Sequence, residues 1–214
     1  MPIDYDTRKI LENIIRGDVL EGTSDNCAIP RNNLCRSFST STTVKKDFEG
    51  QSRIKAEQAE FLRQLSSQWW IDDLPADAIF LTRGGEAKIY FAPDQRSVIK
   101  INDAIYYATW LEFFNSIVIH NLLFDTTAYT FLGFTEIDNT LLAVLRQPYI
   151  RSDAPVNLDD VKKHLASNGF VNTKRNDYFN KELGIILEDM HDENMIVNNN
   201  TLFFIDTVFY TVSE

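Results

Sequence analysis

Three oxygen-bearing side chains in the C-terminal part of the chain have the types and spacing of a site for a divalent metal and proton transfer. Asp189 and Asn194 stand five residues apart, and Asp206 follows a short apolar stretch. A carboxylate can accept a proton from an attacking hydroxyl. An amide oxygen and a second carboxylate can share one Mg²⁺, which prefers oxygen ligands at about 2.0–2.1 Å. The spacing indicates phosphoryl transfer.

The residues between Asn194 and Asp206 predict a β-hairpin that brings these two side chains together. Two apolar stretches, 195–197 and 202–205, flank an asparagine-rich turn. With a three-residue loop at 199–201, Asn194 lies opposite Asp206, with Cβ atoms about 4.5–5.5 Å apart. The alternative is that these acidic and amide residues only shape a turn and end a strand.

A glycine pair and a lysine further upstream predict a phosphate-binding region. Gly84 and Gly85 separate two predicted strands, and glycine lets a backbone approach phosphate oxygens closely. Lys100, on the third predicted strand, can reach the α- and β-phosphates of a nucleotide as a point charge. A glycine pair alone is typical of a hairpin turn, so its weight comes from the strand lysine that follows.

Glu112 is the one charged residue in the apolar stretch 104–119. Burying a carboxylate without a cation is costly. We therefore predict an ion pair between Glu112 and Lys100.

These features together resemble the protein-kinase-like fold. The resemblance rests on the glycine turn and on five side chains: Lys100, Glu112, Asp189, Asn194 and Asp206. It is closest to the kinase domains found in polyvalent proteins of bacterial mobile elements and phages, and it covers about residues 50–208. Asp-Met-His-Asp-Glu-Asn is also similar to the Asp-x-His-x-x-Asn loop of aminoglycoside and choline phosphotransferase-type kinases.

The resemblance implies transfer of the γ-phosphoryl group of ATP to a hydroxyl, with Mg²⁺ as the second cofactor. It implies that Asp189 accepts the proton, that Asn194 and Asp206 bind the metal, and that Lys100, held by Glu112, positions the phosphates. His191 stands where a side chain can touch the γ-phosphate. The implied nucleotide-binding residues are Gly84, Gly85, Val98, Lys100, Gln147 and Tyr149, with Val98 and Leu145 as apolar walls and backbone groups of the run 147–149 against adenine.

The chain also departs from the kinase pattern. Leu187 stands where protein kinases usually carry a histidine, and Thr207 and Val208 follow Asp206 in place of Phe-Gly. Only eight residues follow Asp206, which predicts a reduced C-lobe. The acceptor therefore stays open between a protein serine or threonine, a small amino alcohol or sugar, and nucleotidyl transfer.

Composition limits the partners. The net charge of −10 argues against binding along a nucleic-acid backbone, which needs a basic surface. We expect a nucleotide and a protein or small-molecule acceptor as partners. Two other classes remain as alternatives: a nucleotide-binding pseudokinase, and a regulatory interaction module of a mobile element whose acidic surface mimics nucleic acid.

Other sequence signals favour a cytoplasmic protein without a membrane anchor. Cys27 and Cys35 are too few for a zinc site or a disulfide framework, so we expect reduced thiols. No secretory signal opens the sequence. The stretch 105–124 is about long enough to span a bilayer, but it contains Glu112 and His120 and has no basic anchor, so a buried helix is the better interpretation.

The predicted fold class is α+β, a small bilobal kinase-like fold with a five-stranded N-lobe sheet carrying one helix, a reduced C-lobe and an N-terminal helical extension. The predicted segments are the extension at 1–75, the N-lobe at 76–148 and the C-lobe at 149–214. Periodicity predicts helices at 7–16, 51–68, 103–119 and 157–167, and strands at 79–83, 87–92, 97–101, 128–136 and 141–147. A polar connector with a Ser/Thr-rich run is predicted at 18–44, and 170–187 carries no clear pattern.

Overall fold

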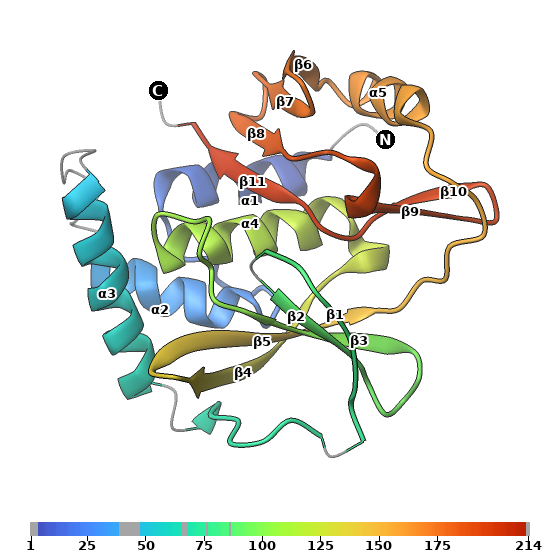
Figure 1. The fold of residues 1–214 in the computed structure, drawn as a ribbon. Helices are drawn as coiled ribbons and strands as arrows, with labels where there is room; N and C mark the ends of the chain where they lie inside the picture. The colour runs from blue at the N-terminus through green and yellow to red at the C-terminus, as the bar shows by residue number, and fades with distance from the viewer. Residues whose placement is uncertain (1–3, 39–47, 66–67, 76, 86, 213–214) are drawn as a thin grey trace. The chain divides into compact units, whose positions relative to one another are not determined.

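The computed structural model describes residues 4–38, 48–65, 68–75, 77–85 and 87–212. The chain forms two compact units, drawn in Figure 1. The first unit comprises Met1–Thr23, Asn115–Ala128 and Ile150–Glu214, and the second comprises Ser24–Phe114 and Tyr129–Tyr149. This grouping differs from the three predicted segments, because most of the predicted N-terminal extension clusters with the sheet of the second unit.

The second unit is built on a five-stranded antiparallel sheet in the order β1-β2-β3-β5-β4 (Figure 1). Its strands are β1 Ile79–Arg83, β2 Ala87–Phe91, β3 Ser97–Asn102, β4 Thr130–Ile137 and β5 Thr140–Pro148. The five predicted strands are therefore confirmed, to within a few residues at each end. β3 and β4 are connected through α4, whereas a tight turn joins β4 to β5 and places Asp138 and Asn139 at φ 49° and 62°, a conformation that these two residue types tolerate well.

Two helices of the second unit precede the sheet, and one of them was not predicted. α3 Phe48–Leu65 confirms a helix at 51–68, whereas α2 Ala28–Phe38 lies in the predicted connector. α2 buries Leu34 and Cys35, and Asn26 before it both donates to and accepts from the backbone of Phe131, at 2.7 and 3.0 Å. The prediction of a connector over 28–38 was wrong, and 39–47, with most of the Ser/Thr-rich run, lies outside the described residues.

α4 Trp110–Leu123 contributes residues to both units and begins later than the helix predicted at 103–119. The side chains of Asn102 and Asp103 accept hydrogen bonds from the N–H groups of Ala104 and Ile105, at 2.6 and 3.0 Å. Such local bonds hold the chain in turns and compete with helix formation. The apolar stretch is therefore a turn followed by a helix.

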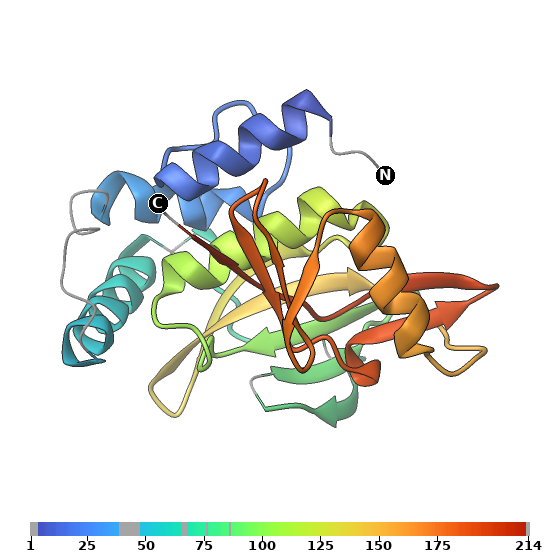
Figure 2. The same cartoon turned by 90° about the horizontal axis from the view of Figure 1, so that it is seen from above.

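The first unit contains two helices, a four-stranded sheet and a separate hairpin (Figure 2). The helices are α1 Tyr5–Arg16 and α5 Leu158–Ser167, which confirm the predicted helices at 7–16 and 157–167. The sheet has the order β11-β8-β7-β6, with β6 Val171–Lys174, β7 Asp177–Asn180, β8 Ile185–Glu188 and β11 Val208–Thr211. The hairpin is formed by β9 Met195–Asn198 and β10 Thr201–Phe204. α5 lies beside this hairpin, with the His164 ring centroid 5.6 Å from that of Phe204.

A short segment crosses the edge strand β4 and requires a glycine there. The N–H of Phe134 donates to the carbonyl of Trp69 at 2.9 Å, and the N–H of Ile71 donates to the carbonyl of Phe134 at 2.8 Å. A Cβ on Gly133 would overlap the carbonyl oxygen of Trp69 and lie 3.0 Å from Cγ1 of Ile71. Glycine at 133 thus lets a second backbone cover the edge strand.

We expect Gly133→Ala to lower the free energy of unfolding by about 3 kcal/mol, because the segment at Trp69 must move away and lose its two hydrogen bonds. Urea titration followed by circular dichroism measures this change. Gly22→Ala is the control, since Gly22 has φ 69° but no atom within 4 Å of the added Cβ. It should lose only about 1 kcal/mol from backbone strain, and equal losses in both variants would contradict the crossing as the cause.

No helix among the described residues is long and apolar enough to cross a membrane. Cys27 and Cys35 are both buried, and neither forms a disulfide bond.

Candidate functional site

The sheet of the first unit brings Asp189 and Asp206 to one end. β8 ends at Glu188 and β11 begins at Val208, and these two residues are paired in the antiparallel register. The residues that follow β8 and precede β11 therefore leave the sheet at the same edge. Asp189 comes directly after β8, and Asp206 stands two residues before β11.

The hairpin between Asn194 and Asp206 forms, but with a different register from the predicted one. Thr201 pairs with Asn198, so the loop has two residues and not three. Asn199 and Asn200 form it at φ 47° and 59°, the left-handed conformation that the tightest hairpin turn requires at both positions. The prediction of a three-residue loop at 199–201 was wrong.

The corrected register still brings Asn194 and Asp206 together through the backbone. The carbonyl of Asn194 accepts hydrogen bonds from the N–H groups of Ile205 and Asp206, at 3.0 and 3.2 Å. Asp206 is thus fixed next to Asn194 by its main chain.

The side chain of Asn194 is held by Asp189. Nδ2 of Asn194 donates to the main-chain carbonyl of Asp189 at 2.7 Å and lies 3.4 Å from Oδ2 of the Asp189 carboxylate. Because the amide nitrogen has these partners, the amide oxygen is the atom through which Asn194 can bind a cation.

His191 lies between these residues. Its Nδ1 accepts a hydrogen bond from the N–H of Glu193 at 3.3 Å, and its Nε2 lies 3.2 Å from Nδ2 of Asn194. Nε2 lies 3.4 Å from Oδ2 of Asp189. In this arrangement His191 supports the Asp189 carboxylate, and its predicted contact with a γ-phosphate stays a prediction.

Asp189 has an unusual backbone conformation. Its φ is 61°, its side chain is 63% exposed, and its N–H donates to Oδ1 of Asp177 at 3.2 Å. A left-handed residue other than glycine is strained, although aspartate tolerates the conformation better than most. Asp177, the first residue of β7, therefore helps to hold Asp189 in this conformation.

Two further carboxylates, missed by the sequence analysis, lie near Asp189. They are Asp177 and Glu188. Burial raises the pKa of Glu188 above its usual range, and the negative charges of Asp177 and Asp189 raise it further. Negative charge thus accumulates at this end of the sheet, which favours binding of a cation.

In the second unit, Lys100 shares a sheet face with the predicted apolar walls. Lys100 pairs with Leu145 and Ile89 across the sheet, so these three side chains lie on one face, together with Val98 two residues away. Lys100 is buried, and its Nζ donates to Oη of Tyr129 at 3.2 Å and lies 5.2 Å from the centroid of that ring. A lysine beside apolar walls fits a site for a phosphorylated heterocycle.

The run 147–149 uses some of its backbone groups within the sheet. The N–H of Tyr149 donates to the carbonyl of Arg96 at 2.9 Å. Antiparallel hydrogen-bonded pairs alternate along a strand, so the backbone of Gln147 also points to β3, where its partner is Val98. The N–H groups of Gln147 and Tyr149 are therefore directed at β3, and the adenine contact predicted for the backbone of 147–149 stays a prediction. The carbonyl of Pro148 points away from β3.

The predicted glycine turn forms a tight hairpin. The N–H of Gly84 donates to the carbonyl of Ala87 at 2.8 Å. A Cβ on Gly85 would overlap the hydroxyl of Tyr106, so that side chain lies directly against the glycine. Because residue 85 has no side chain, the side chain of Tyr106 can lie close to its backbone.

The sequence of the chain matches the model of one known protein family. The family model described as a serine/threonine/tyrosine kinase found in polyvalent proteins matches residues 55–213, most of the chain. The chain belongs to this kinase family. The resemblance inferred from the motifs and the small kinase-like α+β fold are thereby confirmed, and kinase chemistry is the function that membership supports in general terms. No curated protein matched the chain.

Glu112 of this kinase has a different partner from the predicted one. Its N–H donates to Oγ1 of Thr109 at 3.1 Å, and its carboxylate accepts from the N–H of Ala108 at 3.0 Å. The backbone of Thr109 also hydrogen-bonds this carboxylate, which completes a capping box at the start of α4, written in the sequence as Thr-x-x-Glu. Burial raises the pKa of Glu112, and among the described residues the cation that lowers it is Lys55. The predicted ion pair with Lys100 was wrong.

We expect Glu112→Ala to lower the free energy of unfolding by about 1 kcal/mol and Glu112→Gln to leave it nearly unchanged, because glutamine also completes a capping box. Denaturant titration measures both. Phosphotransfer by the glutamine variant should stay near the wild-type rate, and a tenfold loss of rate would indicate that Glu112 belongs to the catalytic site.

The raised pKa of Glu112 also predicts a pH dependence of stability. A carboxyl with a raised folded-state pKa stabilises the fold below its unfolded-state pKa, and this contribution is lost as the pH rises through the folded-state value. The glutamine variant should lack that dependence.

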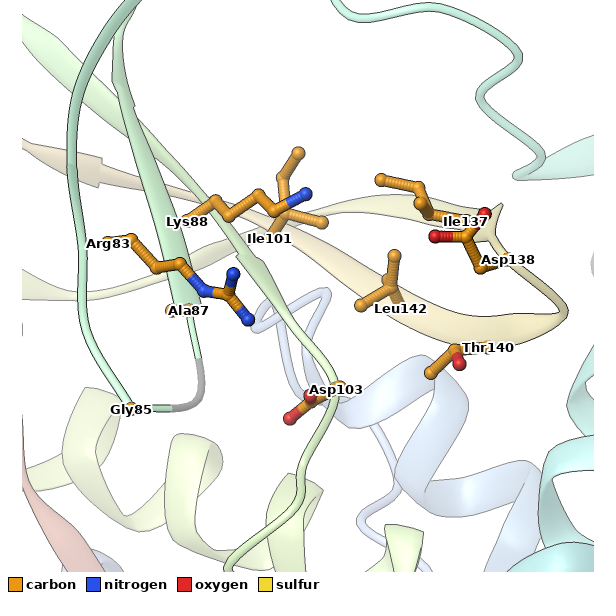
Figure 3. A pocket seen from close by; sticks show the side chains of 10 residues that line it. All are labelled: Arg83, Gly85, Ala87, Lys88, Ile101, Asp103, Ile137, Asp138, Thr140 and Leu142. Carbon is orange, nitrogen blue, oxygen red and sulfur yellow. The ribbon is translucent and has the colours of Figure 1, made fainter.

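A pocket of about 230 Å³ lies elsewhere in the second unit (Figure 3). Its charged residues are Arg83, Lys88, Asp103 and Asp138. Ile101 and Leu142 contribute apolar surface. Ile101 follows Lys100 on β3, and successive strand residues point to opposite faces. Ile101 therefore lies on the face of the sheet opposite to Lys100, and the pocket is also lined by Gly85, one of the predicted nucleotide-binding residues.

Proposed function

We propose that this kinase transfers the γ-phosphoryl group of Mg-ATP to a hydroxyl group of a protein or small molecule. The observation that carries the proposal is the pair of strand registers in the first unit. β8 with β11 and β9 with β10 bring Asp189, Asn194 and Asp206 to one end of the sheet. Membership of a kinase family supports the same chemistry.

Each residue of the first unit has a distinct role in the proposal. The amide oxygen of Asn194 and the carboxylate of Asp206 would hold Mg²⁺, and the carboxylates around Asp189 add to the negative charge that attracts it. Bound Mg²⁺ neutralises charge on the nucleotide phosphates. Asp189 orients the acceptor hydroxyl and takes its proton, and His191, with Nε2 3.4 Å from Oδ2 of Asp189, supports that carboxylate.

Residues of the second unit would bind the nucleotide. Lys100 supplies a positive charge for the phosphates, and Val98 and Leu145, on the same sheet face, provide apolar contact for the adenine ring. Within the run 147–149, the carbonyl of Pro148, which points away from β3, accepts a hydrogen bond from the adenine amino group. Glu112 has no part in this proposal, because its carboxylate caps α4.

The test is incubation of the full chain with γ-labelled ATP, with Mg²⁺ or with excess EDTA, in the presence of a generic protein acceptor and of small amino alcohols. We expect Mg²⁺-dependent release or transfer of label, to an acceptor or to the chain itself. Nucleotide binding without any turnover would contradict the proposal and favour a pseudokinase. A chain whose melting temperature no nucleotide shifts would point to an interaction module.

A further inference from the structure

We infer that His120 of α4 is a positioning residue that orients Asp206 by holding the next residue, Thr207. This inference rests on the proposed function, in which Asp206 is a metal ligand. All residues that carry it belong to the first unit.

His120 is fully buried and has polar partners at both ring nitrogens. Nε2 lies 3.0 Å from the carbonyl oxygen of Thr127, and Nδ1 lies 2.8 Å from Oγ1 of Thr207. A carbonyl can only accept, so Nε2 carries the proton. Nδ1 then accepts, and the hydroxyl of Thr207 donates to it. With this assignment, each of the two hydrogen bonds of His120 has one donor and one acceptor.

A second side chain of α4 binds the same segment. Oγ of Ser116 donates to the carbonyl of Thr207 at 3.5 Å and accepts from the N–H of Phe209 at 2.9 Å. Ser116 and His120 are four residues apart on a helix, so they lie on the same helix face. The side chain and the carbonyl of Thr207 are therefore both bound to α4.

These hydrogen bonds constrain Asp206 because they hold Thr207, the next residue in the chain. On one side, the N–H of Asp206 donates to the carbonyl of Asn194 at 3.2 Å. On the other side, Thr207 is 4% exposed and bound to His120 and Ser116. The main chain of Asp206 is thus fixed at both ends, which limits the directions in which its carboxylate can point.

Nonpolar packing excludes water from this contact. Phe124 stacks on Phe204 and Phe209, with ring centroids 4.4 and 6.2 Å apart, and its ring centroid is 5.4 Å from that of His120. A buried hydrogen bond is costly to lose, because the remaining partner has no water to replace it. The position of Asp206 is therefore sensitive to a single hydroxyl group at Thr207.

The test compares Thr207→Val, which removes the hydroxyl at constant volume, with Thr207→Ser, which keeps it. The probe is Mn²⁺ with a non-hydrolysable ATP analogue, and the readout is the electron paramagnetic resonance signal of the free ion. We expect the dissociation constant of Mn²⁺ to rise about tenfold in the valine variant and less than threefold in the serine variant. The Mg²⁺ concentration that gives the half-maximal turnover rate should also rise more in the valine variant than in the serine variant.

Thr211→Val is the matched control, since it makes the same change on β11 away from His120. It should bind Mn²⁺ as the wild type does. Ser116→Ala removes the other bond to Thr207 and should also weaken Mn²⁺ binding, which keeps the test decisive if Thr207→Val does not fold. A purely structural role would lower the melting temperature of the variants and leave Mn²⁺ affinity below melting unchanged.

The outcomes separate the two proposals. Wild-type Mn²⁺ affinity in both Thr207→Val and Ser116→Ala would contradict the positioning role of His120 and leave the proposed function intact. An equal loss of Mn²⁺ affinity in the valine and serine variants of Thr207 would do the same. A wild-type chain that binds no Mn²⁺ with the analogue and turns over no ATP overturns the proposed function, and this inference with it.

Discussion

An Asp206→Asn variant is expected to fold normally and to lose about 10³-fold of its phosphotransfer rate at saturating Mg-ATP. The proposed transition state is stabilised mainly by charge and positioning, and removing one such group typically costs about 10²–10³-fold. Asparagine keeps the shape and the main-chain bond to Asn194 but removes the negative charge. The measurement is the initial rate of γ-phosphoryl transfer as Mg²⁺ is raised to high concentration.

Asp192→Asn is the control for Asp206→Asn. Asp192 lies in the short helix η4 Asp192–Asn194, on the same stretch of chain, and its side chain is exposed. The control should keep the wild-type rate. Wild-type turnover by Asp206→Asn would refute the metal assignment, and full recovery at high Mg²⁺ would show a role in affinity only.

The convergence of Asp189, Asn194 and Asp206 could be predicted because it is local. The residues concerned lie within one hairpin and its two flanks, so two apolar stretches around a turn signal were sufficient. The exact pairing could not be predicted, because three consecutive asparagines permit a loop of two or three residues. The two-residue loop forms since both of its residues adopt the left-handed conformation that asparagine tolerates.

The burial of Glu112 could be predicted from the sequence, but its hydrogen-bonding partner was predicted wrongly. Its burial was predicted, and burial does raise its pKa. The N–H groups at the start of a helix also stabilise a carboxylate, so burial of Glu112 does not require an ion pair with Lys100. Thr109 three residues earlier was the local signal for a capping box.

Other features depend on contacts between distant residues and left no pattern in the sequence. The strands β6 and β7, Val-Asn-Thr-Lys and Asp-Tyr-Phe-Asn, contain no apolar stretch that would mark them as strands. Asp177, the first residue of β7, meets Asp189 only in the folded sheet. His120 meets Thr207 from 87 residues away, and nothing in the spacing of either residue announces the contact.

The second large effect concerns the proton acceptor. Asp189→Asn is expected to lower the turnover rate by about 10²–10³-fold with little change in the Michaelis constant for ATP. Asparagine adopts the left-handed backbone conformation readily, so φ 61° adds no strain to the variant. The main-chain carbonyl of residue 189 also still accepts from Nδ2 of Asn194. The measurement is steady-state phosphotransfer at saturating Mg²⁺.

Glu188→Gln is the decisive companion, because Glu188 is the neighbouring carboxyl and its raised pKa would also suit a base. Its side chain is partly buried by the sheet, whereas that of Asp189 is 63% exposed and in contact with His191. An acceptor hydroxyl can therefore reach Asp189 more easily, and Glu188→Gln should stay within about threefold of the wild-type rate. A large loss in Glu188→Gln with a small loss in Asp189→Asn would transfer the role of base to Glu188. Equal losses would mean that the shared negative charge of the pair, and not one proton acceptor, sets the rate.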